Sequence, residues 1–118
     1  MNTSEIGGIG EDYAEGILHD KGYIILERNY KSRDGEIDII AKDGETFVFV
    51  EVKTRQSSLY GNPSEAVNYF KQQRIRKTAF WYLKSYDFDM RFDVFEVLYK
   101  PLEEDIEILE YNHIEDAF

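Results

Sequence analysis

Two carboxylates and a lysine, Asp38, Glu51 and Lys53, stand inside two otherwise apolar runs in the first half of the chain. Strands that are apolar on both faces are usually covered on both sides, so a charge within them needs a partner. Two carboxylates on neighbouring strands can share a divalent cation, and an ammonium group beside them can orient a water or stabilise developing negative charge. Hydrolysis of a phosphodiester has these two requirements: a nucleophilic water and neutralised phosphate oxygens.

The two runs flank Asp43-Gly44, a dipeptide that predicts a β-hairpin when hydrophobic residues alternate on either side. With these two residues as the loop, Glu36 faces Glu51 and Asp38 faces Phe49. Side chains alternate along a strand, so one face of the hairpin carries Glu36, Asp38, Glu51 and Lys53. Asp38 and Glu51 become diagonal neighbours, roughly 7–8 Å apart at the backbone. Glu36 opposite Glu51 is repulsive, which a cation must compensate unless a bulge shifts the pairing.

These charges have a second interpretation. Lys and Glu are common on exposed edge hairpins, where they discourage pairing with other chains. Each charge taken alone fits this interpretation equally well. It explains poorly why the acids and a lysine share one face beside such hydrophobic strands, so their combination favours a site.

Length and composition indicate one globular domain spanning residues 1–118. The chain has 118 residues, of which 42% are hydrophobic and 15% aromatic, enough for a substantial core. It has no cysteine, which excludes disulfides and cysteine-ligated metal sites. No apolar run approaches the ~20 residues of a membrane span, and no signal peptide opens the sequence. We therefore expect a cytoplasmic protein that does not contact membranes.

The net charge of −10 is unevenly distributed. Residues 101–118 form an acidic C-terminal segment with seven acids and no Lys or Arg. Residues 66–86 carry five basic residues and no acid. Local fields steer a charged partner more than the total charge does, so the acidity weakens a nucleic-acid-binding hypothesis without removing it.

The apolar patterning predicts the order helix, three strands, helix, two strands. The predicted ranges are a helix over 9–20, strands over 23–30, 35–42 and 45–53, a helix over 63–85, and strands over 91–99 and 105–111, with 1–8 loose. The second helix has the length of a crossover connection, so the strands that it joins are expected to run parallel. The fold class is therefore α/β, with a mixed sheet flanked by helices.

Glu11 borders the apolar stripe of the first helix. It is either a first-turn acid favoured by the helix dipole or a further carboxylate of the site, and both interpretations stay open. His19 and His113 are isolated in the sequence, and neither is given a role.

The second helix carries basic residues among aromatic ones. Asn62, Pro63 and Glu65 predict its start as N-cap, first residue and capping-box partner. Lys71 lies in the middle of its apolar side, where it must reach solvent or find an anion. A second stripe at helical spacing contains Phe70, Arg74, Lys77 and Trp81. This stripe suits phosphate contacts and base stacking, but the aromatic residues suit a core or subunit contact, and the basic ones a solvated face.

A resemblance now becomes visible in these motifs. Asp38 followed by Glu51-Val52-Lys53 resembles the PD-(D/E)xK pattern of the restriction-endonuclease-like nucleases, with Ile37 where that pattern has proline. More closely, the chain resembles the YraN family of small bacterial proteins, whose endonuclease activity is inferred and which are similar to archaeal Holliday-junction resolvases. The motifs that carry this resemblance are Gly10-Glu11, Gly35-Glu36-Ile37-Asp38, Val48 to Arg55, Gly61-Asn62-Pro63, Lys71 and Arg91-Phe92-Asp93-Val94.

The resemblance implies a restriction-endonuclease-like α-β-β-β-α-β core with one extra C-terminal strand. It implies a nuclease that depends on Mg²⁺ or Mn²⁺ and acts on structured or branched DNA. By analogy with the resolvases, it also implies a homodimer. Asp38 and Glu51 are the expected metal ligands, joined by the Val52 carbonyl by family analogy. Lys53 is expected to orient the water, and Glu36 and Glu11 are further catalytic candidates. The expected phosphate contacts are Lys71, Arg55, Arg74 and Lys77.

Two other classes of function remain open. A nucleic-acid-binding module with the same fold but no turnover would bind DNA and ignore Mg²⁺. A protein-interaction subunit would use the acidic segment and the aromatic helix, and would not bind DNA at physiological salt. Salt dependence separates them, because phosphate binding weakens steeply as salt rises.

Overall fold

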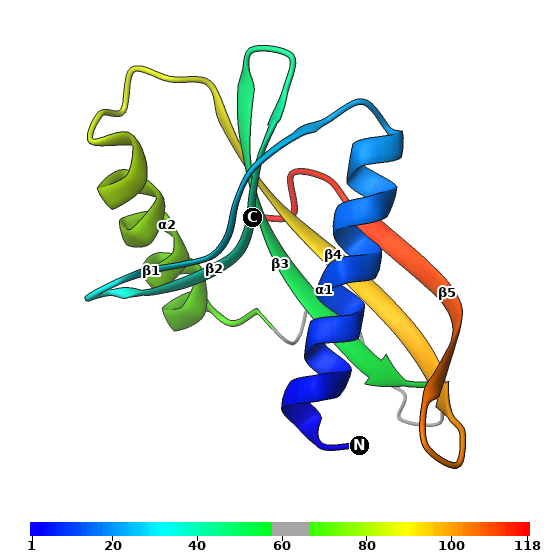
Figure 1. The fold of residues 1–118 in the computed structure, drawn as a ribbon. Coiled ribbons are helices and arrows are strands. Elements are labelled where there is room, and N and C mark those ends of the chain that lie inside the picture. Colours follow the sequence, from blue (N-terminus) through cyan, green and yellow to red (C-terminus); the bar gives the residue numbers. More distant parts are fainter. Residues whose placement is uncertain (58–66) are drawn as a thin grey trace.

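The computed structural model describes residues 1–57 and 67–118 and contains one mixed sheet with two helices (Figure 1). The elements are α1 (Thr3–Asp20), β1 (Ile24–Ser32), β2 (Gly35–Asp43), β3 (Thr46–Gln56), α2 (Tyr69–Leu83), β4 (Met90–Pro101) and β5 (Ile106–Ile114). The strands lie in the order β1-β2-β3-β4-β5. The predicted order of elements is confirmed. So is the crossover, because β3 and β4 are parallel while the other neighbouring strands are antiparallel.

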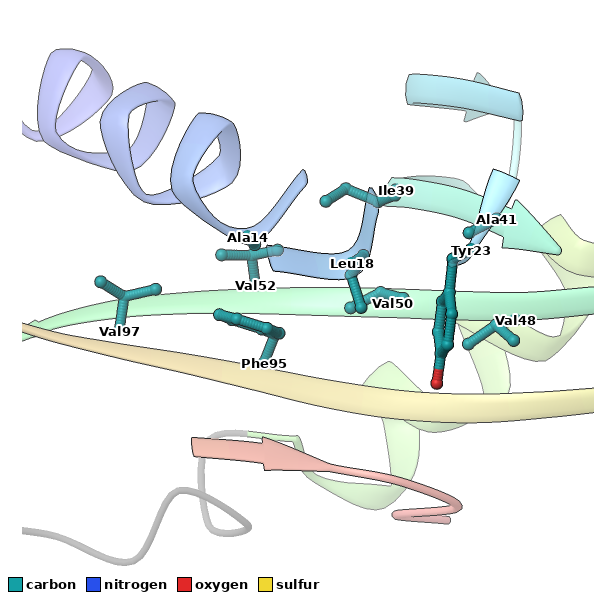
Figure 2. Close-up of a cluster of buried hydrophobic side chains, with 10 residues drawn as sticks. All are labelled: Ala14, Leu18, Tyr23, Ile39, Ala41, Val48, Val50, Val52, Phe95 and Val97. Atoms are coloured by element: carbon teal, nitrogen blue, oxygen red, sulfur yellow. The ribbon is translucent and has the colours of Figure 1, made fainter. Parts of the chain in front are cut away.

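The two helices cover opposite faces of the sheet. Even-numbered residues of β3 point toward α1, where they pack with Ala14 and Leu18 in one core cluster (Figure 2). Phe49 points the other way and packs with Ile75 and Ala79 of α2. Both faces of β3 are thus apolar because both are covered, as the continuous hydrophobic run predicted. A charged residue on this strand is held between the sheet and a helix.

The β2–β3 hairpin has a different loop from the predicted one. Asp43 pairs with Thr46 and Ile39 pairs with Val50, so the loop residues are Gly44 and Glu45 and the register is shifted by two residues. Gly44 has φ of 60°, and a two-residue hairpin loop with positive φ at its first position strongly favours glycine there. The predicted pairing of Glu36 with Glu51 is therefore wrong. A shift of two residues does not by itself move any side chain to the other face.

Both helices begin at an asparagine cap that the sequence analysis did not select. The Asn2 side chain accepts a hydrogen bond from the Glu5 N–H at 2.8 Å, so α1 begins at Thr3 and residues 3–8 are helical instead of loose. The Asn68 side chain accepts from the Lys71 N–H at 2.9 Å and starts α2 at Tyr69, later than predicted. The predicted cap residues at 62, 63 and 65 lie outside the described residues.

The acidic C-terminal segment forms the sheet edge opposite β1. Its residues belong to the β4–β5 turn, to β5 and to the last turn of the chain. The outer half of the β1–β2 hairpin bends toward α2 at the other side of the molecule (Figure 1). Most of the acidic segment thus lies along the β5 edge, while its last residues return to α2, where the Phe118 ring contacts the Arg76 guanidinium. Within residues 1–57 and 67–118, no helix is long and apolar enough to cross a membrane.

Candidate active site

Strands β2 and β3 separate at Asp38. Their ladder ends at the pair Ile39–Val50, and the same register continued would set Asp38 directly opposite Glu51. Asp38 instead accepts a hydrogen bond on Oδ2 from the Val52 N–H at 2.8 Å. The carboxylate fills the gap that the separating strands leave, and it fixes a backbone group that has lost its ladder partner. The two acids expected to share a face are thus neighbours.

A local kink in β1 accompanies this separation. Arg28 pairs with Ile39 and Tyr30 pairs with Ile37, so Asn29 lies across from Asp38. Asn29 has φ of 52°, in the left-handed region that asparagine tolerates better than most residues. The kink disturbs the alternation of side chains, because Ile37 packs on the α2 side together with Ile40.

Glu51 is the buried anion of the site. It is 7% exposed, and Lys71 from α2 reaches it with Nζ 2.5 Å from Oε1. The expectation that Lys71 finds an anion or reaches solvent is met by this ion pair. Lys53, two residues along β3, is partly buried beside both groups. The sheet and α2 together hold two carboxylates and two ammonium groups in one partly closed space.

The titration behaviour of these groups reflects their crowding. Burial first, and then the charge of Glu51, raise the pKa of Asp38 to about 7, although the Val52 N–H and Lys71 act in the opposite direction. Burial and the neighbouring Lys71 lower the pKa of Lys53. Burial alone would lower the pKa of Lys71. The hydrogen bond and the attraction between Lys71 and Glu51 outweigh burial, so the pKa of Lys71 is raised. A buried acid with a raised pKa beside a lysine with a lowered pKa is typical of functional sites.

Glu11 and Glu36 approach the site from the β1 side. Because carboxylates only accept hydrogen bonds, the Asn29 amide turns its nitrogen to them and donates to one oxygen of each at 3.1 Å. Arg28 also binds Glu11, with Nη2 3.3 Å from Oε1. Side chains of β1 therefore hold both Glu11 and Glu36. The charge of Glu11 also contributes to the raised pKa of Asp38. Sequence reasoning missed Asn29 and Arg28; the tolerance of asparagine for positive φ was the signal available.

A close backbone contact seats α1 against the site. A Cβ on Gly10 would lie 1.8 Å from the hydroxyl oxygen of Thr54 on β3, which is far inside the contact distance of real atoms. Only glycine lets the helix approach β3 this closely at this turn. Gly10 directly precedes Glu11, so the contact also brings Glu11 toward the acids of the hairpin.

The four expected phosphate contacts divide into two pairs. Lys71 is bound to Glu51, and Arg55 lies with Nη2 2.7 Å from Oε2 of Glu96. Arg74 and Lys77 are exposed on α2. The exposed pair is available to an approaching polyanion, whereas Lys71 and Arg55 are directed at carboxylates.

The site lies within a stretch of sequence that relatives share. The profile of the uncharacterised protein family UPF0102, which is the YraN family, matches residues 10–97. The chain belongs to this family. UPF0102 proteins from Clostridium tetani and Alkaliphilus oremlandii are 49% and 51% identical to it, covering 100% and 98% of this chain and 98% and 99% of their own. A UPF0102 protein from Dictyoglomus turgidum is 43% identical, with both chains covered completely. The resemblance inferred from the motifs is confirmed, and the family description names no activity.

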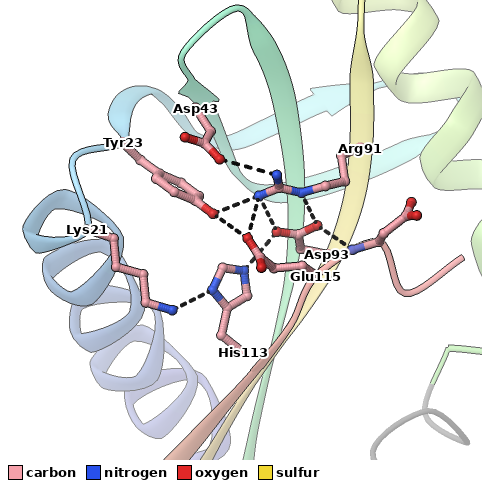
Figure 3. A network of polar contacts seen from close by, with 8 residues as sticks. Lys21, Tyr23, Asp43, Arg91, Asp93, His113 and Glu115 are labelled. Atoms are coloured by element: carbon pink, nitrogen blue, oxygen red, sulfur yellow. Dashed lines mark hydrogen bonds and ion pairs between the residues drawn. The ribbon is translucent and has the colours of Figure 1, made fainter.

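This UPF0102 chain contains a second polar cluster, on the α1 face of the sheet (Figure 3). Asp93, His113 and Glu115 have ligand atoms within 4.8 Å of one another, close enough to hold a metal ion. Arg91 already occupies the cluster, with Nε 2.9 Å from Oδ1 of Asp93 and Nη2 3.2 Å from Oε1 of Glu115. His113, to which the sequence gave no role, lies 2.7 Å from Oδ2 of Asp93 and is 2% exposed.

The electrostatics of this second cluster indicate a structural role. Burial favours the neutral form of Asp93, but hydrogen bonds from His113 and Arg91 outweigh it and lower the pKa of Asp93. Arg91 also contacts the Tyr23 hydroxyl at 2.7 Å and Asp43 at 3.2 Å. The guanidinium thus already supplies the positive charge that a metal would bring, and the network joins β2, β4 and β5 to the loop after α1.

The Asp38–Glu51 site fits a hard divalent cation better than the cluster of Asp93, His113 and Glu115 does. Its donors are carboxylate oxygens, which Mg²⁺ and Mn²⁺ prefer, and only Oδ2 of Asp38 takes the Val52 N–H. Lys71 pairs with Glu51, and yet the charge of Glu51 still raises the pKa of Asp38, so the repulsion between the two acids is only partly compensated. The residues present therefore suit the metal that the resemblance implies, with Lys71 as the internal counter-ion.

Proposed function

We propose that this protein is a metal-dependent nuclease that hydrolyses phosphodiester bonds in structured or branched DNA. The single observation that carries the proposal is the pairing of the Asp38 and Glu51 carboxylates between Lys53 and Lys71 in a partly buried site. Carboxylates pushed together in a low-dielectric space destabilise the folded protein, so their retention favours a functional role. The same donor set would hold Mg²⁺ or Mn²⁺, and Glu11, whose charge contributes to the raised pKa of Asp38, and Glu36 remain further candidates for contacts with its water shell.

Each residue has a stated part in the proposed reaction. A divalent cation held by Asp38 and Glu51 would polarise the scissile phosphate and lower the pKa of a coordinated water. Lys53 Nζ, whose pKa is lowered, holds the attacking water by a hydrogen bond, and its neutral amine form would accept the proton of that water. Lys71, which pairs with Glu51, would contact a phosphate oxygen as a point charge. The Val52 carbonyl is the proposed third protein ligand.

The charge distribution supports DNA as the substrate. Arg74 and Lys77 are exposed on α2, while most acids of the acidic segment lie on β5 and on the turn before it, at the sheet edge opposite β1. A basic face in an otherwise acidic protein orients a polyanion and keeps it away from the acidic edge. A homodimer belongs to the proposal, because a symmetric branched junction is cut at two related points.

Cleavage assays test the proposal directly. Purified protein is incubated with four-way junctions, flaps, single strands and duplexes, in chelator and in millimolar Mg²⁺ or Mn²⁺. We expect cleavage only with metal, and a loss of at least about 100-fold in Glu51→Gln and Lys53→Met. Glu110→Gln, which removes an exposed acid from β5, is the matched control and should cleave like wild type.

Each other outcome identifies a different error. Cleavage that survives both site substitutions, or persists in excess chelator, means that the site is elsewhere. DNA binding without cleavage in metal assigns the non-catalytic binding module. An absence of DNA binding at physiological salt assigns the protein-interaction subunit. Circular dichroism of each variant confirms that the fold is retained.

A further inference from the structure

A second concave surface lies beyond the acidic site, between the tip of the β1–β2 hairpin and the C-terminal half of α2. This cavity of about 340 Å³ is lined by Tyr30, Lys31, Ser32, Arg33, Trp81 and Lys84, and we name it the tip cavity. The lining combines three cations with two aromatic rings. No catalytic role in the proposed reaction uses any of these six residues.

The tip cavity is built on a fixed frame. The Trp81 indole N–H donates to Oδ2 of Asp34 at 2.6 Å, and the hydroxyls of Ser32 and Thr78 lie 3.1 Å apart. Gly35 has φ of 155° and runs so close to α2 that a Cβ would lie 3.4 Å from the Thr78 hydroxyl. Two hydrogen bonds and the close packing at Gly35 thereby join the hairpin tip to the helix and support the walls of the cavity.

The cations of the tip cavity lack acidic partners. Within residues 1–57 and 67–118, Lys31, Arg33 and Lys84 form no ion pair. Asp34, the acid at the tip, is occupied by the Trp81 indole N–H. The Arg33 guanidinium carbon lies 4.7 Å from the centre of the Trp81 ring, a contact that leaves its N–H donors available. A guanidinium held on an aromatic ring beside two lysines suits a phosphate with an adjoining planar base.

The distance from the tip cavity to the acidic site, formed by Asp38 and Glu51, determines how many nucleotides separate the two contacts on a bound DNA strand. Lys31 pairs with Glu36, which is two residues from Asp38, or about 7 Å along β2. Lys84 is thirteen residues beyond Lys71, or about 20 Å along α2. For a strand that stays stacked between the two sites, with about 3.4 Å of rise per nucleotide, the tip cavity lies roughly two to six nucleotides from a phosphate at the acidic site.

We propose that the tip cavity binds the DNA strand two to six nucleotides from the cleaved phosphate, with Arg33, Lys31 and Lys84 on phosphate oxygens and a base against Trp81. This inference rests on the proposed function, which it extends by fixing how the substrate is held. A base can reach an aromatic side chain where the strand is unstacked, as it is in single strands and at branch points. The cavity therefore favours substrates with unpaired nucleotides near the cut, and it acts on binding rather than on the chemical step.

Tryptophan fluorescence tests this placement. Trp81 is the only tryptophan in the chain, so its emission reports on the tip cavity alone. In chelator, a single-stranded 12-mer should quench this emission over the same concentration range in which it binds. A dinucleotide, too short to span both sites, should leave the emission unchanged at the same concentration.

A matched set of variants completes the experiment. Arg33→Ala combined with Lys84→Ala should weaken binding of the single-stranded 12-mer about 10-fold and reduce the slope of log affinity against log salt by about 1.4. Hydrolysis of bis(p-nitrophenyl) phosphate, a diester that reaches only the acidic site, should keep its rate. Lys100→Ala removes an exposed lysine from the far end of β4 and should change neither quantity.

The two proposals fail separately. If DNA binds and quenches Trp81 emission but is not cleaved in metal, the nuclease proposal is refuted and the proposed role of the tip cavity stands. If DNA binds or is cleaved without any change in Trp81 emission, the proposed role of the tip cavity is refuted and the nuclease proposal is unaffected. Affinity of the double variant equal to that of Lys100→Ala also overturns the inference, as does an absence of DNA binding.

Discussion

Replacing Asp38 by Asn should stabilise the metal-free protein in a pH-dependent way. The pKa of Asp38 is raised from 3.8 to about 7 by burial and by Glu51. Between these two values the folded protein keeps a proton that the unfolded chain releases. The free energy of unfolding therefore falls as pH rises from about 4 to 7, and the full penalty is present above pH 7. Asn has the shape of the protonated acid and never ionises, so the variant escapes the penalty.

The shift sets the size of the effect. About three pKa units correspond to roughly 4 kcal/mol, and coupling to Glu51 and Lys71 lets neighbouring groups absorb part of it. The carbonyl oxygen of Asn still accepts from the Val52 N–H, so that hydrogen bond is retained. We expect Asp38→Asn to gain about 2–4 kcal/mol at pH 8 and close to none at pH 4. For a chain of this length, the gain at pH 8 raises the melting temperature by roughly 10 °C.

Thermal and urea unfolding in chelator between pH 4 and 8.5 measure this difference. Asp87→Asn, which neutralises an exposed acid after α2, controls for the change in net charge and should shift the curve little at any pH. Millimolar Mn²⁺ should then raise the melting temperature of wild type and leave Asp38→Asn nearly unchanged. A gain that is equal at all pH values would refute the role given to ionisation. A variant that melts lower than wild type at pH 8 and still responds to metal would make Asp38 a structural residue.

Two further predictions concern the frame around the site. Gly10→Ala should lower the free energy of unfolding by about 1–3 kcal/mol in thermal melts, because the new Cβ meets Thr54, whereas Gly16→Ala, with open space around it, should raise it by up to about 1 kcal/mol. Adding Thr54→Ala to Gly10→Ala should recover part of the loss. If nothing is recovered, the contact with Thr54 is not the cause. Asp93→Ala should lower the free energy of unfolding in urea by about 3–5 kcal/mol, because Arg91 and His113 lose the buried carboxylate that both of them contact. Asp43→Ala, which removes a partly exposed acid of the same network, should lower it by less than about 1 kcal/mol. Equal costs at Asp93 and Asp43 would contradict the burial argument.

The sequence predicted that Asp38, Glu51 and Lys53 lie close together, even though the pairing was wrong. The real loop at Gly44-Glu45 shifts the register by two residues, which by itself moves no side chain to the other face. The kink opposite Asp38 was not predicted, and it breaks the alternation between Ile37 and Ile40. Lys71 was also anticipated, because an ammonium group at the centre of an apolar helix side requires an anion. Helical and strand periodicities therefore carried most of the site.

The parts that were missed depend on contacts between distant elements. The bond from Val52 N–H to Asp38 exists because two strands separate, which no local pattern announces. Asn29 takes positive φ only where β1 must kink against β2. His113 is isolated in sequence and acquires partners from β4 and from Lys21 after folding. The start of α2 was predicted from Asn62, Pro63 and Glu65, whereas its cap is Asn68, which has Lys71 and no capping-box acid three residues later.

The position of a bound metal ion tests the central claim most directly. Crystals soaked in MnCl₂ and measured at a wavelength with strong manganese anomalous scattering reveal the ion without any assumption about activity. An anomalous peak about 2.2 Å from carboxylate oxygens of both Asp38 and Glu51 is the predicted result. A peak at the cluster of Asp93, His113 and Glu115, or no peak at saturating Mn²⁺, would contradict it.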